Sequence, residues 1–382
     1  MQYQSLYRKY RPKNFDEVIG QEHITKTLQN QIMSNKIGHA YLFTGTRGVG
    51  KTSIAKIFAK AVNCESNKNG SPCFECETCN RLANESDINI IELDAASNNK
   101  VDDIREIREK VKFTPVGAKY KVYIIDEVHM LTDSAFNALL KTLEEPPSYV
   151  IFILATTEIH KLPQTILSRC IRFDFRLVST LELTNHLKHI FDIEGIKYED
   201  EALKLIASAG EGSVRDTLSI ADSVVAYSGG NVTKDGVLKI LGTTDYDLIL
   251  NFYDYLINKD AGGILGLIDK MEESGKNLPV FAKDVSKHAR NLLVCKTCKD
   301  PDKILNLPKE ILEKFKEQST KIEEKKLISF MQIFSGIEAE LRYTLSTRLL
   351  LETVSLSAIY GEDQVKKNWQ LKTIKQLQLN LM

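Results

Sequence analysis

The segment at residues 45–53 constrains the fold of this chain more than any other. Its sequence, Gly-Thr-Arg-Gly-Val-Gly-Lys-Thr-Ser, fits the pattern G-x-x-x-x-G-K-[ST] between an apolar run at 40–43 and a helix-forming stretch at 52–62. In such a loop the glycines let backbone N–H groups face inward around phosphate oxygens, and the helix N-terminus adds partial positive charge. The lysine reaches the β- and γ-phosphates, and the next hydroxyl ligates magnesium. The pattern therefore predicts a site for a nucleoside triphosphate and Mg²⁺ whose contact residues are Gly45, Thr46, Gly48, Val49, Gly50, Lys51, Thr52 and Ser53.

A second segment predicts the residues that hydrolyse the nucleotide. Residues 122–125 form an apolar run, typical of a buried parallel strand, and Asp126 and Glu127 follow directly. Asp126 is placed to hold magnesium, directly or through water, and Glu127 to orient and deprotonate the attacking water. An acidic pair at the end of a strand is weak evidence alone. Combined with the phosphate loop and Lys51, it favours hydrolysis.

Four of the seven cysteines lie close together and predict a metal site. Cys64, Cys73, Cys76 and Cys79 have the spacing C-x8-C-x2-C-x2-C, with a turn-rich stretch at 69–72. Four thiolates favour a closed, tetrahedral, structural Zn²⁺ site, because no position is left for water. An iron–sulfur cluster is the rival reading, and two disulfides are a third. We refer to residues 64–79 as the cysteine module; it is predicted to be an insertion in the nucleotide-binding fold.

Composition bounds the domain organisation and the partners. A chain of 382 residues is too long for one simple core, so two or three domains are expected. Lys+Arg and Asp+Glu are equal at 51 each, so no domain-wide basic footprint predicts nucleic-acid binding. No apolar stretch has membrane-spanning length, and the N-terminus is polar. We expect a cytoplasmic protein without a membrane partner.

Apolar strands and helical patterns alternate through the first half of the chain, which predicts a parallel sheet with helices on both faces. The expected strands are 40–43, 88–93, 121–125 and 149–155, and the expected helices are 24–34, 52–62, 101–111 and 133–143. The later pattern is helical only, at 180–191, 199–209, 213–226, 233–241, 248–257, 261–274, 278–294, 309–317, 323–342 and 347–358, with a linker at 242–245. The predicted domains are residues 1–178, 179–242 and 243–362, followed by a polar tail at 363–382.

Several motifs occur in an order that resembles the AAA+ clamp-loader ATPases. They are the segments 7–12 (YRKYRP), 15–21 (FDEVIGQ), 45–53, 126–131 (DEVHML), 137–147 (NALLKTLEEPP), 154–158 (LATTE), 166–170 (ILSRC) and 212–215 (GSVR). With the cysteine module, the resemblance is to the gamma/tau family of bacterial DNA polymerase III and covers residues 3–360. It implies an α/β AAA+ P-loop NTPase domain with the zinc insertion, a small helical lid domain and an all-α C-terminal collar domain.

The resemblance implies further site residues. Thr157 matches sensor 1, a polar residue that contacts the γ-phosphate or the attacking water. Arg215 matches sensor 2, which reaches from the lid to the phosphates, and Arg169 matches the arginine finger inserted into a neighbouring subunit's site. The adenine pocket is expected to be lined by Tyr7, Arg11, Pro12, Val18 and Ile19.

The resemblance also implies partners. An ATP-driven clamp-loader subunit opens a sliding clamp and places it on primer–template DNA, in company with delta and delta-prime subunits and further copies of itself. Single-stranded DNA-binding protein is expected only through other subunits, and the chain has no polymerase site of its own. The similarity is to the shorter gamma form, so the helicase and polymerase contacts of tau extensions are not expected.

The DNA contact is a separate hypothesis. Helix N-termini can hold backbone phosphates without a large basic patch, and Asn98, Asn99 and Arg105 lie at such a start. The alternative reading, a polar cap and a solvated helix face, stays open. Clamp contacts are expected around residues 113–118.

Two other functions remain open on the sequence. A non-hydrolysing scaffold subunit would contribute only Arg169, which the intact phosphate loop and acidic pair argue against. An AAA+ branch-migration helicase would carry a C-terminal winged-helix domain and no four-cysteine insertion, the reverse of the pattern here.

Overall fold

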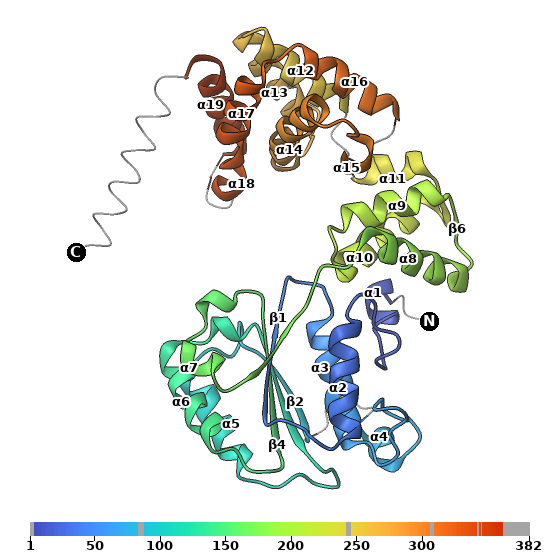
Figure 1. Ribbon diagram of the computed structural model, residues 1–382, viewed down its shortest axis with the longest axis vertical. Helices are drawn as coiled ribbons and strands as arrows, with labels where there is room; N and C mark the ends of the chain where they lie inside the picture. The colour runs from blue at the N-terminus through green and yellow to red at the C-terminus, as the bar shows by residue number, and fades with distance from the viewer. Residues whose placement is uncertain are drawn as a thin grey trace, which may run out of the picture. The chain divides into compact units, whose positions relative to one another are not determined.

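The computed structural model describes residues 4–82, 88–241, 246–305, 309–341, 344 and 346–361. The chain divides into two compact units, Met1–Leu241 and Gly242–Met382. We describe each by itself. In Figure 1 the first unit runs from blue to yellow-green and the second from yellow to red.

The centre of the first unit is a five-stranded parallel sheet in the order β2-β3-β4-β1-β5. Its strands are β1 (Ala40–Thr44), β2 (Ile90–Asp94), β3 (Lys121–Asp126), β4 (Val150–Thr156) and β5 (Ile171–Asp174). All residues of β1 and β4 are buried, as expected for strands covered on both faces. The sheet matches the predicted architecture.

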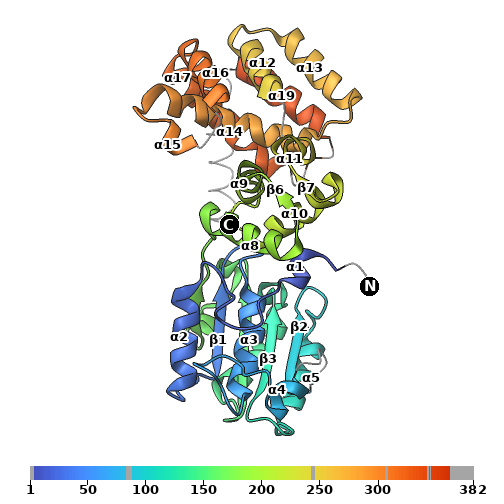
Figure 2. The same cartoon turned by 90° about the vertical axis from the view of Figure 1, so that its right-hand side faces the viewer.

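Helices cover the sheet from both sides, as Figures 1 and 2 show. On one face, α2 (Glu22–Met33) and α3 (Lys51–Asn63) pack against Tyr41 and Phe43. On the other face, α5 (Val101–Val111) and α6 (Asp133–Glu144) pack against Leu42 and Tyr123. Alternate residues of β1 therefore enter opposite cores, which is the pleat of a fully buried strand.

The predicted strands are confirmed with shifts of one or two residues at their ends, but β5 was missed. Only Phe173 of β5 is buried, so this short edge strand lacks the continuous apolar run by which the others were found. Short elements of irregular sequence were missed too: α1 (Leu6–Lys9), α4 (Glu77–Arg81), η1 (Val128–Met130), η2 (Ile159–Lys161) and α7 (Gln164–Leu167).

The predicted helices between residues 180 and 241 are present and form the lid of the first unit. They are α8 (Thr180–Glu194), α9 (Asp200–Ala209), α10 (Val214–Ser228) and α11 (Lys234–Leu241), with a small parallel pair, β6 (Lys197–Tyr198) and β7 (Asn231–Val232), that was not predicted. A capping box of Ser179 and Glu182 starts α8. The N-terminal α1 belongs to the lid core, because Leu6 is buried there and its N–H donates to Asp222.

The second unit is helical. Its elements are α12 (Tyr246–Ile257), α13 (Ala261–Glu273), α14 (Leu278–Thr297), α15 (Asp302–Leu305), α16 (Lys309–Thr320), α17 (Glu324–Ser335), α18 (Ile337–Glu340) and α19 (Thr347–Tyr360). The prediction of one helix over 323–342 is wrong. The helix is interrupted at Gly336, between α17 and α18, because glycine disfavours a continuous helix. The predicted linker at 242–245 and the tail at 363–382 lie outside the described residues.

Within the described ranges, none of the helices combines the length and apolar character needed to cross a lipid bilayer.

Candidate nucleotide site and cysteine cluster

The loop between β1 and α3 has the backbone shape that its sequence predicts. Gly48 and Gly50 have φ angles of 79° and 101°, in the region that favours glycine, and Gly50 is the N-cap of α3. The loop thus ends at the start of a thirteen-residue helix. Backbone N–H groups at such a helix start are left free to bind an anion.

Lys51 is buried within this loop. Its Nζ donates to the carbonyl oxygens of Gly45 and Thr46, both at 2.8 Å. Burial lowers the pKa of Lys51, while Glu127 and Asp126 act in the opposite direction. The loop therefore holds a positive charge beside the N-terminus of α3, where phosphate oxygens are expected.

Thr52 and Asp126 lie together. Asp126 is the last residue of β3, and the Thr52 hydroxyl donates to its Oδ2 at 2.7 Å. A hydroxyl and a carboxylate next to a phosphate loop are the oxygen ligands that Mg²⁺ takes in nucleotide sites. The residues present fit magnesium.

Glu127 and Thr157 are also brought together, at the ends of the neighbouring strands β3 and β4. Both the N–H and the hydroxyl of Thr157 donate to Glu127 Oε2, at 3.3 and 3.0 Å. Glu127 has a φ of 47°, unusual for a residue with a side chain. Such local strain is typical of functional sites and occurs here at the predicted base.

The lid contributes to the same site. The Arg215 N–H, on α10, donates to the Gly48 carbonyl at 3.3 Å, and its guanidinium lies 5.3 Å from the centre of the Tyr7 ring. Arg11 Nε donates to the Ser53 hydroxyl at 3.1 Å. Val49, also predicted, is buried in the sheet core.

The other predicted adenine-pocket residues bridge the two cores of the first unit. Val18 packs against the sheet core, whereas Ile19 and Tyr7 pack against the lid core. Pro12, which lies between Tyr7 and Val18 in the sequence, is half-buried. The N-terminal segment therefore joins the sheet to the lid beside the loop.

Arg169 lies elsewhere. It precedes β5, which runs parallel to β1, so Arg169 is at the amino end of the strands and the phosphate loop is at their carboxyl end. Its guanidinium donates to Glu144 Oε1 and to the Thr165 carbonyl, both at 2.8 Å. The structure does not bring Arg169 to the phosphate loop of its own chain.

The residues of the DNA hypothesis make local contacts. The Asn98 side chain donates to the Asp94 carbonyl, the Asn99 carbonyl accepts from Thr132, and Arg105 pairs with Asp102 at the surface. These contacts form a turn and a solvated helix face, and they neither require nor prevent a DNA contact. The hypothesis stays a prediction.

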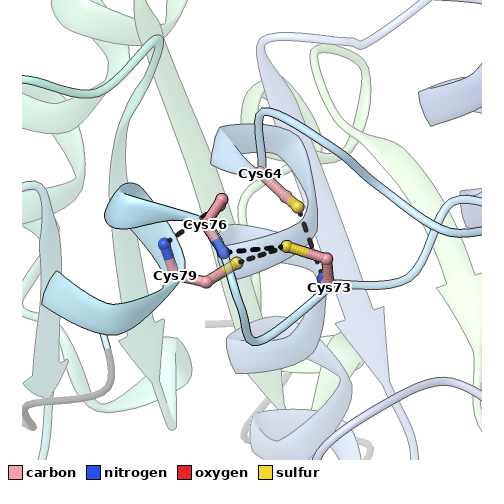
Figure 3. A group of neighbouring side chains, drawn as sticks. All are labelled: Cys64, Cys73, Cys76 and Cys79. Carbon is pink, nitrogen blue, oxygen red and sulfur yellow. Dashed lines mark hydrogen bonds between the residues drawn. The ribbon is translucent and has the colours of Figure 1, made fainter.

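The four thiols of the cysteine module converge, as Figure 3 shows. Their sulfur atoms all lie within 4.8 Å of one another, and Cys73 and Cys79 Sγ are 3.9 Å apart. A tetrahedral zinc with Zn–S distances of about 2.3 Å requires sulfurs about 3.8 Å apart. The cluster fits zinc.

Backbone groups support the thiolates. The Cys73, Cys76 and Cys79 N–H groups each donate to the sulfur of the preceding cysteine of the module, at 3.4, 3.3 and 3.3 Å. N–H donation from Glu75 and Cys76 lowers the pKa of Cys73 to about 6, whereas burial raises that of Cys79. Bound zinc would hold α4 to the end of α3, where Cys64 is the C-cap. In both views α4 lies at the end of the sheet away from α1 and α10, so the module is remote from the nucleotide loop.

Changing Cys79 to serine is expected to reduce the zinc content from about one ion per chain to near zero, because a buried ligand of a closed site is lost. Metal analysis of the purified chain measures this, and limited proteolysis reports the loosening of the cysteine module. The matched control is Cys170→Ser, which leaves all four ligands in place. A wild-type chain that carries iron with a visible absorption band, or no metal when refolded with zinc, would contradict this expectation.

Sequence analysis overlooked one residue at the nucleotide site. His129, on η1, has a side chain only 6% exposed and lies between the carboxylates of Glu127 and Glu158. Its position two residues after Glu127, in a turn that follows a strand, was the available signal. A single histidine near an acidic pair is common in sequences, so this position alone did not identify His129 as a site residue.

Family models match nearly all of the chain. "DNA polymerase III, delta subunit" matches residues 20–179, "DNA polymerase III clamp loader subunit, ATPase lid domain" residues 182–230, and "DNA polymerase III subunits gamma and tau domain III" residues 232–374. The three matches follow one another in the order of the sheet, the lid and the second helical unit.

Curated relatives agree. The tau subunit of Bacillus subtilis is 46% identical over 352 residues, which cover 92% of this chain and 62% of that protein, so the chain spans about three-fifths of that relative. The gamma subunit of Buchnera aphidicola is 42% identical over 275 residues, 72% of this chain and 76% of that protein.

Among solved structures, the Holliday junction branch migration motor RuvB of Thermotoga maritima is similar at a TM-score of 0.48 and 23% identity, over 64% of this chain and 79% of that one. A TM-score this low does not support a statement about the family or function of this chain. The matched sheet, lid and C-terminal domains, together with the identity to the Buchnera subunit, place the chain in the gamma/tau family of clamp-loader subunits of DNA polymerase III.

Proposed function

We propose that this chain is an ATP-hydrolysing motor subunit of the replicative clamp loader, which opens a sliding clamp and places it on primer–template DNA. The observation that carries the proposal is the convergence of Lys51, the Thr52–Asp126 pair and the Glu127–Thr157 pair around one loop. A scaffold subunit has no need of this full set.

The chemistry of the site follows from its own residues. Lys51 and the α3 N-terminus bind the β- and γ-phosphates, and Glu127 takes a proton from the attacking water. Thr157, whose hydroxyl donates to Glu127, would act as sensor 1 toward the attacking water or the γ-phosphate. Thr52 and Asp126 would hold Mg²⁺, which when bound neutralises phosphate charge.

The lid contact supports nucleotide-dependent coupling within the first unit. Arg215 follows the N-cap of α10, Ser213, and its backbone already touches Gly48. ATP in the loop would be reached by the Arg215 guanidinium, so binding would favour one arrangement of lid and loop.

Gly48→Ala is expected to weaken ATP binding by at least about tenfold, because the added Cβ forces the loop out of its position. A tenfold loss corresponds to about 1.4 kcal/mol of binding free energy. An added Cβ would lie 2.0 Å from Ser213 Oγ, at a φ of 79°. Equilibrium binding of a fluorescent ATP analogue measures the change.

Ser213→Gly in the Gly48→Ala background removes the Ser213 side-chain contacts but keeps the tight approach to Arg215 Cβ and the strained φ, so it should restore part of the affinity. Gly266→Ala, whose Cβ meets nothing within 4 Å, is the control. Unchanged ATP affinity in Gly48→Ala would contradict the close contact of lid and loop.

The position of Arg169 supports its action in trans. It lies at the amino end of the strands, away from its own phosphate loop, so a catalytic guanidinium at this place serves a neighbouring site. The proposed neighbours are further copies of the chain and the delta and delta-prime subunits. In this assembly the domains would be the ATPase domain at 1–178, the lid at 179–242 and a collar at 243–362, followed by a tail at 363–382. The boundary between the two compact units, after Leu241, supports the proposed boundary between lid and collar.

Steady-state ATP hydrolysis tests the proposal. The purified chain, alone and with delta and delta-prime subunits, is measured with and without primer–template DNA over a range of protein concentrations. Turnover that rises with DNA, and faster than linearly with protein, supports a motor whose sites are completed between subunits. Absence of turnover in the complete assembly would exclude the motor and leave the scaffold.

A further inference from the structure

His129 makes contacts that position it for a role in the proposed reaction. Its ring is nearly enclosed, with 6% of the side chain exposed, and it lies on the single turn η1 directly after Glu127. Nδ1 is 3.0 Å from Thr156 Oγ1 and 3.4 Å from Glu127 Oε2, and Nε2 is 3.1 Å from Glu158 Oε2.

The partners determine where the ring proton lies. An ionised carboxylate only accepts hydrogen bonds, so Nε2 carries a proton and donates it to Glu158. Lys161 holds Glu158 ionised, because its hydrogen bond lowers the pKa of that carboxyl. Nδ1 likewise faces two oxygens, Glu127 Oε2 and Thr156 Oγ1, so the ring holds Glu127 when it carries a proton on this nitrogen too; the Thr156 oxygen also accepts from the Glu158 N–H at 3.0 Å.

The ring and Thr157 together restrict one oxygen of the base. Within the described ranges, the contacts of the Glu127 carboxylate with Thr157 and with the His129 ring all involve Oε2: two hydrogen bonds from Thr157 and the approach of His129 Nδ1. With Oε2 held in this way, Oε1 is left to accept the proton of water. In catalytic triads and at metal sites a carboxylate similarly orients an imidazole that acts on a third group.

We propose that His129 is a positioning residue for Glu127: together with Thr157 it fixes Glu127 Oε2, and Glu158 in turn fixes the His129 ring. The inference rests on the proposed function, because it assigns a role within ATP hydrolysis. It also couples the base to Glu158, the residue directly after the proposed sensor Thr157.

The test separates turnover from binding. His129→Ala in the assembled clamp loader is expected to lower kcat by between about tenfold and about 100-fold, the loss that follows from a misplaced catalytic group. ATP affinity, measured by equilibrium binding, should stay within about twofold, because Lys51 and the loop are untouched. Glu158→Ala should lower kcat in the same direction, and Glu158→Gln should retain more activity, because its amide oxygen still accepts from Nε2.

A double variant gives a readout that a purely structural role would not move. If His129 acts through Glu127, adding His129→Ala to Glu127→Gln should lower the residual turnover by less than about twofold, whereas independent effects would multiply. His160→Ala is the matched control, since that ring is 73% exposed and sits 3.8 Å from the same Glu158.

Each outcome decides the inference. If the wild-type assembly hydrolyses ATP and the His129→Ala assembly does so at the same rate, the inference is overturned and the proposed function stands. Parallel loss of ATP affinity, or multiplicative loss in the double variant, assigns His129 to structure and also overturns it. Absence of turnover in the wild-type assembly overturns the proposed function and this inference with it.

Discussion

Arg169→Ala is expected to lower ATP turnover of the assembled clamp loader by about 10³-fold or more, the effect of removing an arginine finger. A guanidinium delivered by a neighbour neutralises charge that develops on the transferred phosphoryl group. The altered chain should bind ATP normally, because Arg169 lies at the opposite end of the strands from its own phosphate loop.

Single-turnover hydrolysis and equilibrium ATP binding, measured on the same preparation, check this expectation. Arg172→Ala is the control, since Arg172 is an exposed arginine nearby that pairs with Asp174. A loss of ATP affinity in the Arg169→Ala chain, or full turnover by the assembly, would refute the assignment in trans.

Glu127→Gln is expected to reduce turnover by about 10²-fold or more, the contribution typical of a general base. The amide keeps the shape of the side chain and can still accept from Thr157, but it cannot take a proton from water. ATP binding should be retained, so the variant would hold unhydrolysed ATP.

A filter-binding or fluorescence measurement of bound ATP over time distinguishes this result from a folding defect. Glu109→Gln, an exposed carboxylate that pairs with Lys112, is the control. Turnover near that of the wild type would show that another group accepts the proton.

Local sequence patterns predicted much of this fold and site because they have short-range causes. A strand, a glycine-rich turn and a helix start in consecutive residues place Lys51 and Thr52, and the apolar run before Asp126 places that carboxylate at the sheet edge. Cysteine spacing likewise predicted the convergence of Cys64, Cys73, Cys76 and Cys79.

Features that depend on long-range packing could not be predicted. The edge strand β5 is recognisable only through its pairing with β1, because three of its four residues are exposed. The bonds of Glu127 to Thr157 join residues thirty positions apart through the register of β3 and β4. The contact of His129 with Glu158 likewise depends on packing, because Glu158 follows β4 whereas His129 follows β3.

Complementation between two inactive variants tests most directly whether each site is completed by a neighbour. Glu127→Gln and Arg169→Ala chains are mixed in equal amounts before assembly with delta and delta-prime subunits, and ATP hydrolysis is measured with sliding clamp and primer–template DNA. A Glu127→Gln chain still carries Arg169 and can complete the site of an Arg169→Ala neighbour, so turnover of the mixture should rise well above that of either variant alone. Turnover equal to the mean of the two separate variants would contradict hydrolysis at shared sites.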